Sequence, residues 1–181
     1  MIRGIGWITQ KKYGCKKQKW QRKYTDLKSL YNCLQPEIFK YPVANFLRFD
    51  TVSKLTLLSI ALALSDAKIA YGPNKKQDIS ILGTNPHGAL DANLAYFNDY
   101  IDHGRTLGRG NLFIYTLASS PLAEAAIYFG LTGKLLYLGF TKNTKQASLK
   151  YALNMLKNEP GKTIILVNAG SKTATAYILQ K

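Results

Sequence analysis

The chain has 181 residues, of which 46% are hydrophobic and 19% charged, so it suits one globular domain with a real core rather than a disordered or repetitive chain. Its 25 basic and 10 acidic residues give a formal net charge of +15, which favours nucleic acid, an anionic membrane surface or an acidic protein as the partner. The longest apolar run, residues 55–64, has about half of the roughly 20 residues that a membrane span needs, so we expect no membrane span.

The N-terminus lacks the long apolar segment of a secretory signal. Two cysteines, Cys15 and Cys33, give neither a disulfide framework nor a zinc signature, and we expect a cytoplasmic protein. The charge is unevenly distributed, because residues 1–54 hold 12 basic and 3 acidic side chains, whereas residues 85–130 hold 2 basic and 4 acidic ones.

The pattern of apolar and turn-forming residues predicts alternating strands and helices. A strand at residues 2–9 precedes a basic, exposed segment at 11–28 in which Tyr13, Trp20 and Tyr24 are interleaved. Asp50 is expected to cap a helix over 51–68 that is apolar around nearly its whole circumference and therefore buried on most sides. We further expect strands at 78–83, 135–140, 163–168 and 173–179, and helices at 27–34, 89–102, 121–129 and 143–158.

Strands separated by helix-length segments indicate parallel pairing with helices on both faces of a sheet, which is the α/β layered class. No internal repeat appears, so we expect one domain.

The middle of the chain carries a resemblance to a known family. The sequence Ser65-Asp66-Ala67, the strand ending at Gly83-Thr84 and the stretch SPLAEAAIYFGLTG at residues 120–133 resemble the N-terminal half of β-ketoacyl-acyl-carrier-protein synthases of the thiolase superfamily. The likeness runs from about residue 2 to 170, and the basic segment 11–28 matches nothing in the family. It implies a three-layer α-β-α, thiolase-like half-fold with a mixed, mostly parallel five-stranded sheet, and a single β-ketoacyl synthase N-terminal-like domain over 1–181 with a basic insertion at 11–28.

The family's catalytic cysteine has no counterpart at the corresponding place. Counting about nine residues from Gly133 reaches Lys142, and Lys134 stands where the family usually has proline. The two histidines that complete the family's Cys-His-His site belong to the half that this chain does not resemble. Condensation needs a thiolate that holds the acyl group as a thioester, and an amine would form a poor acyl donor instead. We therefore predict no catalytic, cofactor-binding or metal-binding residues and no cofactor, and Lys142 is expected to be a solvated lysine at a helix start.

Several cysteine, histidine and serine residues could have a functional role or only an ordinary structural one. Lys16 and Lys17 should lower the pKa of Cys15, although neither cysteine matches the family's position. His87 and His103 are expected to be capping or surface residues near helix ends, and Ser119 and Ser120 are expected to cap a helix that starts at Pro121.

The loop at 104–110, with Arg105 and Arg109, lacks the Walker pattern, so we expect it to line a partner interface rather than to hold a phosphate.

Three functions remain open from the sequence. The first is a ketosynthase-like, non-catalytic subunit of fatty-acid or polyketide-type biosynthesis that pairs with a full-length ketosynthase or docks an acyl carrier protein, as a homo- or hetero-oligomer. The second is an acyltransferase or condensing enzyme completed by another chain. The third is a basic nucleic-acid-binding module centred on residues 11–28, which we weigh below the other partners.

Overall fold

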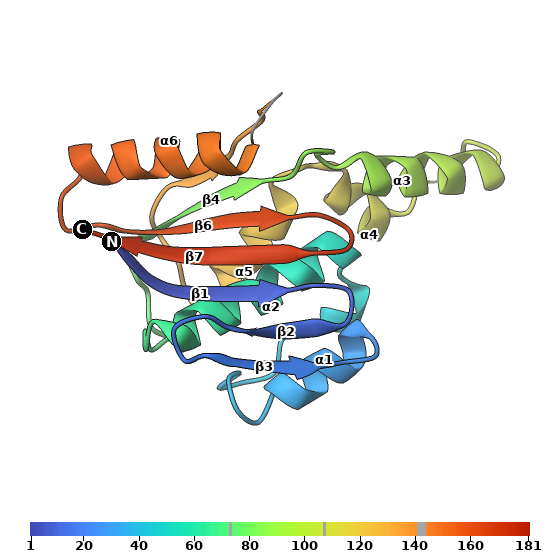
Figure 1. Cartoon of the computed structure of the whole chain (residues 1–181). Coiled ribbons are helices and arrows are strands. Elements are labelled where there is room, and N and C mark those ends of the chain that lie inside the picture. The colour runs from blue at the N-terminus through green and yellow to red at the C-terminus, as the bar shows by residue number, and fades with distance from the viewer. Residues whose placement is uncertain (73, 107, 141–143) are drawn as a thin grey trace.

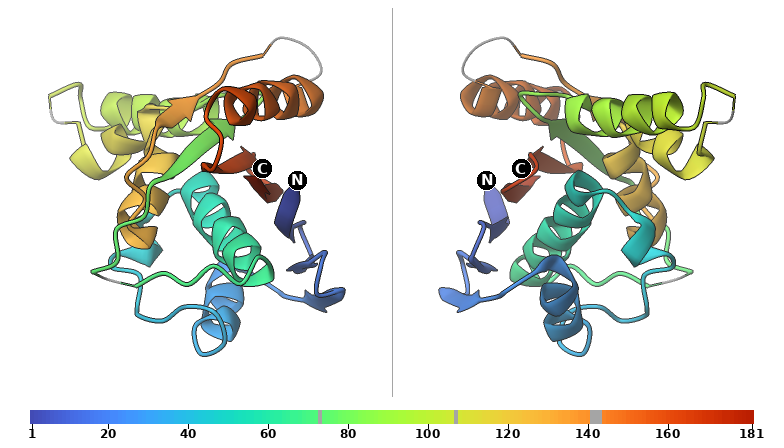
Figure 2. Two further views of the ribbon diagram at one scale, coloured as in Figure 1. Left: turned by 90° about the vertical axis from the view of Figure 1, so that its left-hand side faces the viewer. Right: turned by 90° about the vertical axis from the view of Figure 1, so that its right-hand side faces the viewer.

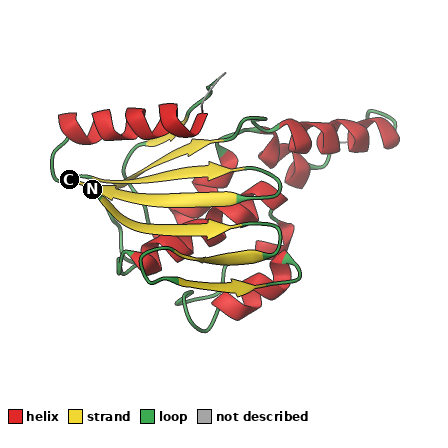
Figure 3. Cartoon of the chain, viewed as in Figure 1, coloured by secondary structure: helices red, strands yellow, loops and turns green. Residues whose placement is uncertain are grey.

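The computed structural model describes residues 1–72, 74–106, 108–140 and 144–181. Over this part of the chain one sheet runs through the molecule, with its strands in the order β3-β2-β1-β7-β6-β4-β5 (Figures 1 and 3). In chain order the strands are β1 (Ile2–Ile8), β2 (Lys12–Cys15), β3 (Trp20–Lys23), β4 (Ile79–Thr84), β5 (Leu135–Tyr137), β6 (Thr163–Ala169) and β7 (Ala174–Gln180). The helices are α1 (Leu27–Leu34), α2 (Thr51–Asp66), α3 (Leu90–Asp102), α4 (Gly110–Phe113), α5 (Ser120–Phe129) and α6 (Thr144–Asn158), with 3-10 turns at Phe46–Arg48 and Ile114–Thr116.

Helices cover both faces of this sheet, so the expected three-layer α-β-α arrangement is confirmed (Figure 2). On one face α2 contacts β1, β6 and β7 and also packs against α5 and α1, whereas α6 lies on the other face against β4 and β6. The strand count and the pairing differ from the expectation. The described residues form seven strands rather than five, and only β4–β5 and β4–β6 pair in parallel, while the other four pairings are antiparallel.

The two extra strands come from the basic segment 11–28, for which the sequence predicted exposure but no strand. Side chains alternate there, since Tyr13 and Cys15 point into the core while Lys12 lies on the outer face. This period of two extends the sheet as the hairpin β2–β3, with Lys12 opposite Lys23 and Cys15 opposite Trp20. The basic charges are therefore carried on an ordered surface.

The buried helix α2 is as the sequence predicted. Twelve of its sixteen residues are buried, and the Asp50 carboxylate accepts a hydrogen bond from the Ser53 N–H at 2.7 Å, which caps its first turn. The glycines of β1 let this helix approach the sheet backbone, because a β-carbon on Gly6 would lie 2.4 Å from the Ser59 carbonyl oxygen. The central layer is therefore packed backbone against backbone.

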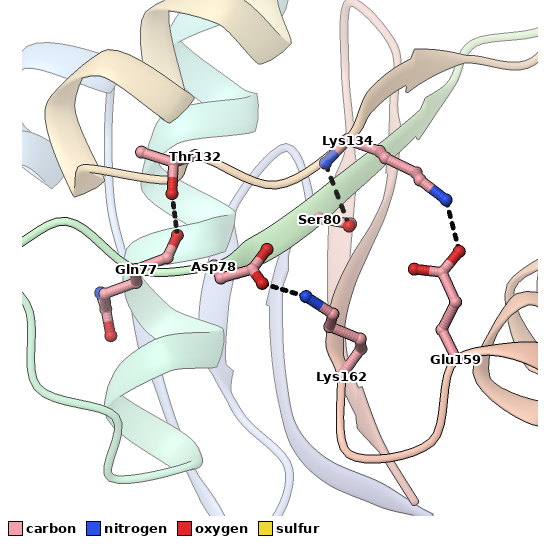
Figure 4. Close-up of polar contacts among 7 residues, drawn as sticks. All are labelled: Gln77, Asp78, Ser80, Thr132, Lys134, Glu159 and Lys162. Carbon is pink, nitrogen blue, oxygen red and sulfur yellow. Dashed lines mark hydrogen bonds and ion pairs between the residues drawn. The ribbon is translucent and has the colours of Figure 1, made fainter.

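The start of β4 is held by the turns on either side of it (Figure 4). The Thr132 hydroxyl donates to the Gln77 carbonyl at 3.1 Å, and the Lys134 N–H donates to the Ser80 hydroxyl at 3.1 Å. Ion pairs join Lys134 to Glu159 and Lys162 to Asp78. These contacts fix the parallel strands, whose opposite ends form the site described below.

The described helices include no single one that is both long and apolar enough to cross a membrane. Among the described helices one bent pair, Gly110–Thr116 with Ser120–Phe129 at 100°, reaches that length and composition together.

Candidate functional site

A cavity of about 40 Å³ lies where the carboxyl end of β4 meets the first turns of α2, α3 and α5. Loop edges at the carboxyl ends of parallel strands are common ligand positions in α/β sheets, because the chain reverses there. A single water needs about 10–15 Å³ by this measure, so the cavity holds a few water-sized groups. Its polar lining comes from several segments of the chain and includes Asp50, Thr56, Thr84, Asn85, Tyr115 and Tyr137.

The turn that follows β4 forms one wall. The Asn85 side-chain amide donates to the Gly88 carbonyl at 2.7 Å, and its oxygen accepts from the His87 N–H at 3.0 Å. Such an Asx turn fixes the backbone that leads into α3. The Tyr137 hydroxyl of β5 donates to the Asn85 carbonyl at 2.9 Å, which ties the turn to the edge strand.

Tyr115, in the 3-10 turn before α5, brings a buried phenol to the cavity lining. Burial, together with the negative charges of Glu124 and Asp50, raises the pKa of Tyr115 to about 12. Burial also raises the pKa of the Glu124 carboxyl. Tyr115 is therefore a protonated hydrogen-bond donor at neutral pH rather than a base.

Two buried threonines complete the lining. The Thr84 hydroxyl donates to the Asn168 side-chain oxygen across the parallel pair β4–β6. Thr56 is fully buried in α2, and its hydroxyl has no hydrogen-bond partner among the described residues. The cavity thus offers a hydroxyl and a phenol to a small polar group.

Among the described residues, this arrangement has hydrogen-bonding capacity but no nucleophile paired with a base. No cysteine lines the cavity, and His87 is exposed at its edge. Within the described ranges no three His, Cys, Asp or Glu side chains are grouped so as to hold a metal ion. Lys142, which the resemblance puts at the nucleophile position, lies outside the described residues.

The expectation that Cys15 has a lowered thiol pKa is wrong. Its side chain points into the core, where the thiol donates to the Leu62 carbonyl at 3.3 Å. Burial raises the pKa of the Cys15 thiol to about 12, and the negative charge of Asp66 acts in the same direction. The neighbouring lysines point into solvent and do not offset this burial.

The predicted helix-end residues are where the sequence placed them, with different bonding at the serines. His103 ends α3, and its ring nitrogen Nδ1 lies 2.8 Å from the Asp99 carbonyl oxygen. Ser119 is at the N-cap of α5 but its side chain makes no cap hydrogen bond, and Ser120 instead donates to the Ile114 carbonyl.

One arginine of the loop after α3 forms an ion pair with that helix. Arg109 forms an ion pair with Asp99, whose side chain is only 6% exposed, and this pairing lowers the pKa of Asp99. Arg105 is exposed and adopts a left-handed backbone conformation, with φ of 61°. The described part of this loop therefore belongs to the tip of a helical arm and does not line the cavity.

Sequence reasoning did not find the cavity. Asp50 was singled out as a cap and His87 as a surface residue, but Thr56, Tyr115 and Tyr137 carried no motif. Their approach depends on the packing of α2 and α5 under the strand ends. The one available signal was Asn85 directly after a strand, which is typical of a turn at such an edge.

Neither a protein-family model nor a curated protein matches the chain. Solved structures do match its fold. A ketosynthase in complex with its chain length factor, from Xenorhabdus doucetiae, aligns with a TM-score of 0.58 at 16% identity, over 80% of this chain and 63% of that one.

Two further structures align over nearly the whole chain. A type II polyketide synthase acyl-carrier protein in complex with its ketosynthase bound to the hexaketide gives a TM-score of 0.65 at 9% identity, over 99% of this chain and 57% of that one. A β-ketoacyl synthase from Burkholderia phymatum gives 0.61 at 11% identity, over 99% and 58%. The chain thus spans about three fifths of the length of these structures. At such identities the likeness concerns architecture, and it establishes that this chain has the thiolase-like fold of ketosynthases and chain length factors.

Proposed function

We propose that the chain is a ketosynthase-like subunit of fatty-acid or polyketide-type biosynthesis that has no condensing activity of its own. In this role it forms a single β-ketoacyl synthase N-terminal-like domain and acts as a partner of a full-length ketosynthase or as a docking surface for an acyl carrier protein. The observation that carries the proposal is the position of the two cysteines in a ketosynthase fold. Cys15 ends β2 with its side chain buried against α2, and Cys33 lies on α1, so neither is at the carboxyl end of β4 where the cavity lies.

The positions of the cysteines matter because the condensation reaction needs a thiolate at the active site. A condensing enzyme stores its acyl group as a thioester on a thiolate before the new carbon–carbon bond forms. A thiol with a pKa of about 12 is protonated at neutral pH, so Cys15 supplies almost no thiolate. Both thiols are free, which suits the reducing cytoplasm that the sequence indicates.

The hairpin β2–β3 supports a docking role. Lys12 and Lys23 are directly opposite each other on adjacent strands, and both are exposed. Like charges in such a pair repel, so a bound anionic partner would relieve their repulsion. Among the hairpin's basic side chains in the described structure, Arg22 is the one that forms an ion pair, with Glu37 at 2.7 Å. An acidic carrier protein is the partner that this charge favours.

The first test asks whether the chain accepts an acyl group. The purified chain is incubated with acyl-acyl-carrier-protein and with acyl-coenzyme A, and its intact mass is measured. We expect no acyl adduct. An adduct on Cys15, Cys33 or Lys142 that turns over would overturn the non-catalytic role and favour the enzyme completed by another chain.

The second test measures docking. Titration calorimetry with acyl carrier protein should show binding that weakens as salt rises, because exposed charges are screened. The variant Lys12→Glu/Lys23→Glu should lose this binding, whereas Lys150→Glu/Lys157→Glu on α6 has the same charge change elsewhere and should keep it. Binding of neither the carrier protein nor a full-length ketosynthase would contradict the proposed role. If single-stranded nucleic acid then binds with a steep salt dependence, the chain is better interpreted as a nucleic-acid-binding module.

A further inference from the structure

A stripe of apolar side chains runs along the outer face of α3. The exposed fractions are 50% for Leu90, 50% for Leu94, 56% for Phe97 and 39% for Ile101. At 3.6 residues per turn, these four positions fall within about 60° of the helix circumference. A continuous apolar stripe of this kind marks a contact surface more often than scattered exposed residues do.

The opposite side of α3 is the side that packs on the molecule. Asp99 is buried there, and the Tyr96 ring lies 5.5 Å from the Phe113 ring of α4. The helix is thereby held in place while its apolar stripe is left uncovered by the described parts of the chain. In Figure 1 α3 extends away from the sheet as an arm.

The spacing of the stripe is symmetric along the helix. The steps from Leu90 to Leu94 to Phe97 to Ile101 are four, three and four residues. A second α3 laid antiparallel therefore meets the first in register, with Leu90 against the partner's Ile101 and Leu94 against the partner's Phe97. A two-fold axis between Leu94 and Phe97 generates this pairing, and such self-complementarity is what a symmetric dimer requires.

Charge selects this face for contact between two copies. Residues 85–130 carry a net charge of −2 and the rest of the chain carries +17, which together give the total of +15. The thirteen residues of α3 span about 20 Å, which exceeds the Debye length of about 8 Å at physiological salt. Contact between arms therefore keeps the two basic bodies apart and opposes only two segments of −2, whereas contact between the bodies would oppose two charges of +17.

We propose that two copies of this chain associate through antiparallel packing of their α3 helices. In this dimer His103, at the tip of one arm, lies beside the partner's Gly88, in the turn that borders the cavity. The tip of each arm then contributes to the surroundings of the other copy's cavity. This proposal rests on the stripe and the charge distribution, and it holds whether or not the chain binds a carrier protein.

Sedimentation velocity at several concentrations tests the association. We expect a monomer–dimer equilibrium that shifts toward dimer as salt rises, because salt screens the repulsion between two +15 molecules. The variant Leu94→Ser/Phe97→Ser should be monomeric. The control Leu47→Ser/Ile127→Ser removes two side chains that are 65% and 78% exposed outside the stripe, and it should dimerise like the unaltered chain. A monomer at every salt concentration, or a dimer that both variants retain, would overturn the proposal.

Disulfide cross-linking tests the register in a Cys33→Ser background. The variant Leu90→Cys/Ile101→Cys should form a covalent dimer on oxidation, because the two positions face each other across the axis. Each single variant should not, because its cysteines lie eleven residues apart along the paired helices, about 16 Å, and a disulfide needs Cα atoms within about 7 Å. Cross-linking of the single variants would indicate a parallel contact and exclude the antiparallel one.

Discussion

Gly6 of β1 lies so close to Ser59 of α2 that a β-carbon on the glycine would come within 2.4 Å of the Ser59 carbonyl oxygen and 2.5 Å of the Ala63 nitrogen. Both are backbone atoms of a helix packed on all sides, so they cannot move aside as a flexible side chain could. Gly6→Ala should therefore lower the free energy of unfolding by about 1–3 kcal/mol or more, which is the usual cost of overpacking.

Thermal unfolding checks this, with about 2–4 °C of melting temperature lost per kcal/mol in a chain of this size. Gly170→Ala is the matched control, because a β-carbon there has no atom within 4 Å and should leave the melting temperature nearly unchanged. Equal melting temperatures for the two variants would mean that α2 is not packed on β1 in this way.

Asp66 joins the hairpin to the core, which leads to a second prediction. Its carboxylate accepts hydrogen bonds from the N–H groups of Ile5, Lys17 and Gln18 at 2.8, 3.1 and 2.9 Å. Asp66→Ala leaves the part-buried Ile5 donor unpaired, at a cost of about 1–3 kcal/mol. Hydrogen exchange should show faster exchange of the β2–β3 amides in this variant, with Asp66→Asn intermediate because it keeps one acceptor oxygen. Unchanged hairpin exchange would show that the hairpin is held by its own strands alone.

The hairpin also shows where sequence reasoning stopped. Lys11, Lys12 and the following lysines dominate residues 11–28, and their charge indicated an exposed segment. The structural signal was the alternation of Tyr13 and Cys15 with outward-pointing residues, a period of two that a high density of charge obscures. The other predicted strands and the five predicted helices carried stronger patterns, and their boundaries agree with the structure within a few residues, whereas the short helix α4 was not predicted.

The candidate cavity was beyond the reach of sequence patterns for a different reason. Thr56, Tyr115 and Tyr137 meet only because α2, the segment before α5 and the edge strand converge at the carboxyl end of β4. Each residue has an ordinary local role in its own element, so no short motif marks the set. Periodicity places a residue on one face of its own helix or strand, but it does not say which other element covers that face.

Cysteine reactivity gives a third prediction. Cys15 is buried with a thiol pKa of about 12, whereas Cys33 is exposed. At pH 8 the Cys15 thiol is protonated, so iodoacetamide should modify the native chain once, at Cys33. After unfolding in urea two modifications are expected, and peptide mass spectrometry distinguishes the sites. Fast modification of Cys15 in the native chain would reopen its role as a nucleophile.

The stability of the chain should depend on pH through Asp99, which lies in α3. Its pairing with Arg109 lowers the pKa of the Asp99 carboxyl, and His103 faces the same carboxylate at 3.5 Å. A carboxyl with a lowered folded-state pKa contributes stability above its unfolded pKa, about 3.9, and this contribution disappears as pH falls through the folded-state pKa. Urea unfolding should therefore find the chain more stable than Asp99→Asn at pH 7, with the difference shrinking below about pH 4. A difference that stays constant down to pH 2.5 would contradict the pairing.

Lys134 stands where the resembling family usually has proline, and its contacts explain why proline would not serve in this chain. Its N–H donates to the Ser80 hydroxyl at 3.1 Å, its carbonyl accepts from the Ile81 N–H at 2.8 Å, and its ammonium group pairs with Glu159 (Figure 4). Proline has no N–H, so Lys134→Pro removes a donor to a serine that is only 4% exposed.

We expect this variant to lose about 1 kcal/mol or more of unfolding free energy in urea. Lys134→Ala keeps the N–H and loses only an ion pair whose lysine is 58% exposed, which is worth up to about 1 kcal/mol, whereas Lys134→Pro loses both and should be the less stable of the two. If the proline and alanine variants have the same free energy of unfolding, the hydrogen bond to Ser80 does not stabilise the fold. Lysine and proline would then be equivalent at this position for stability.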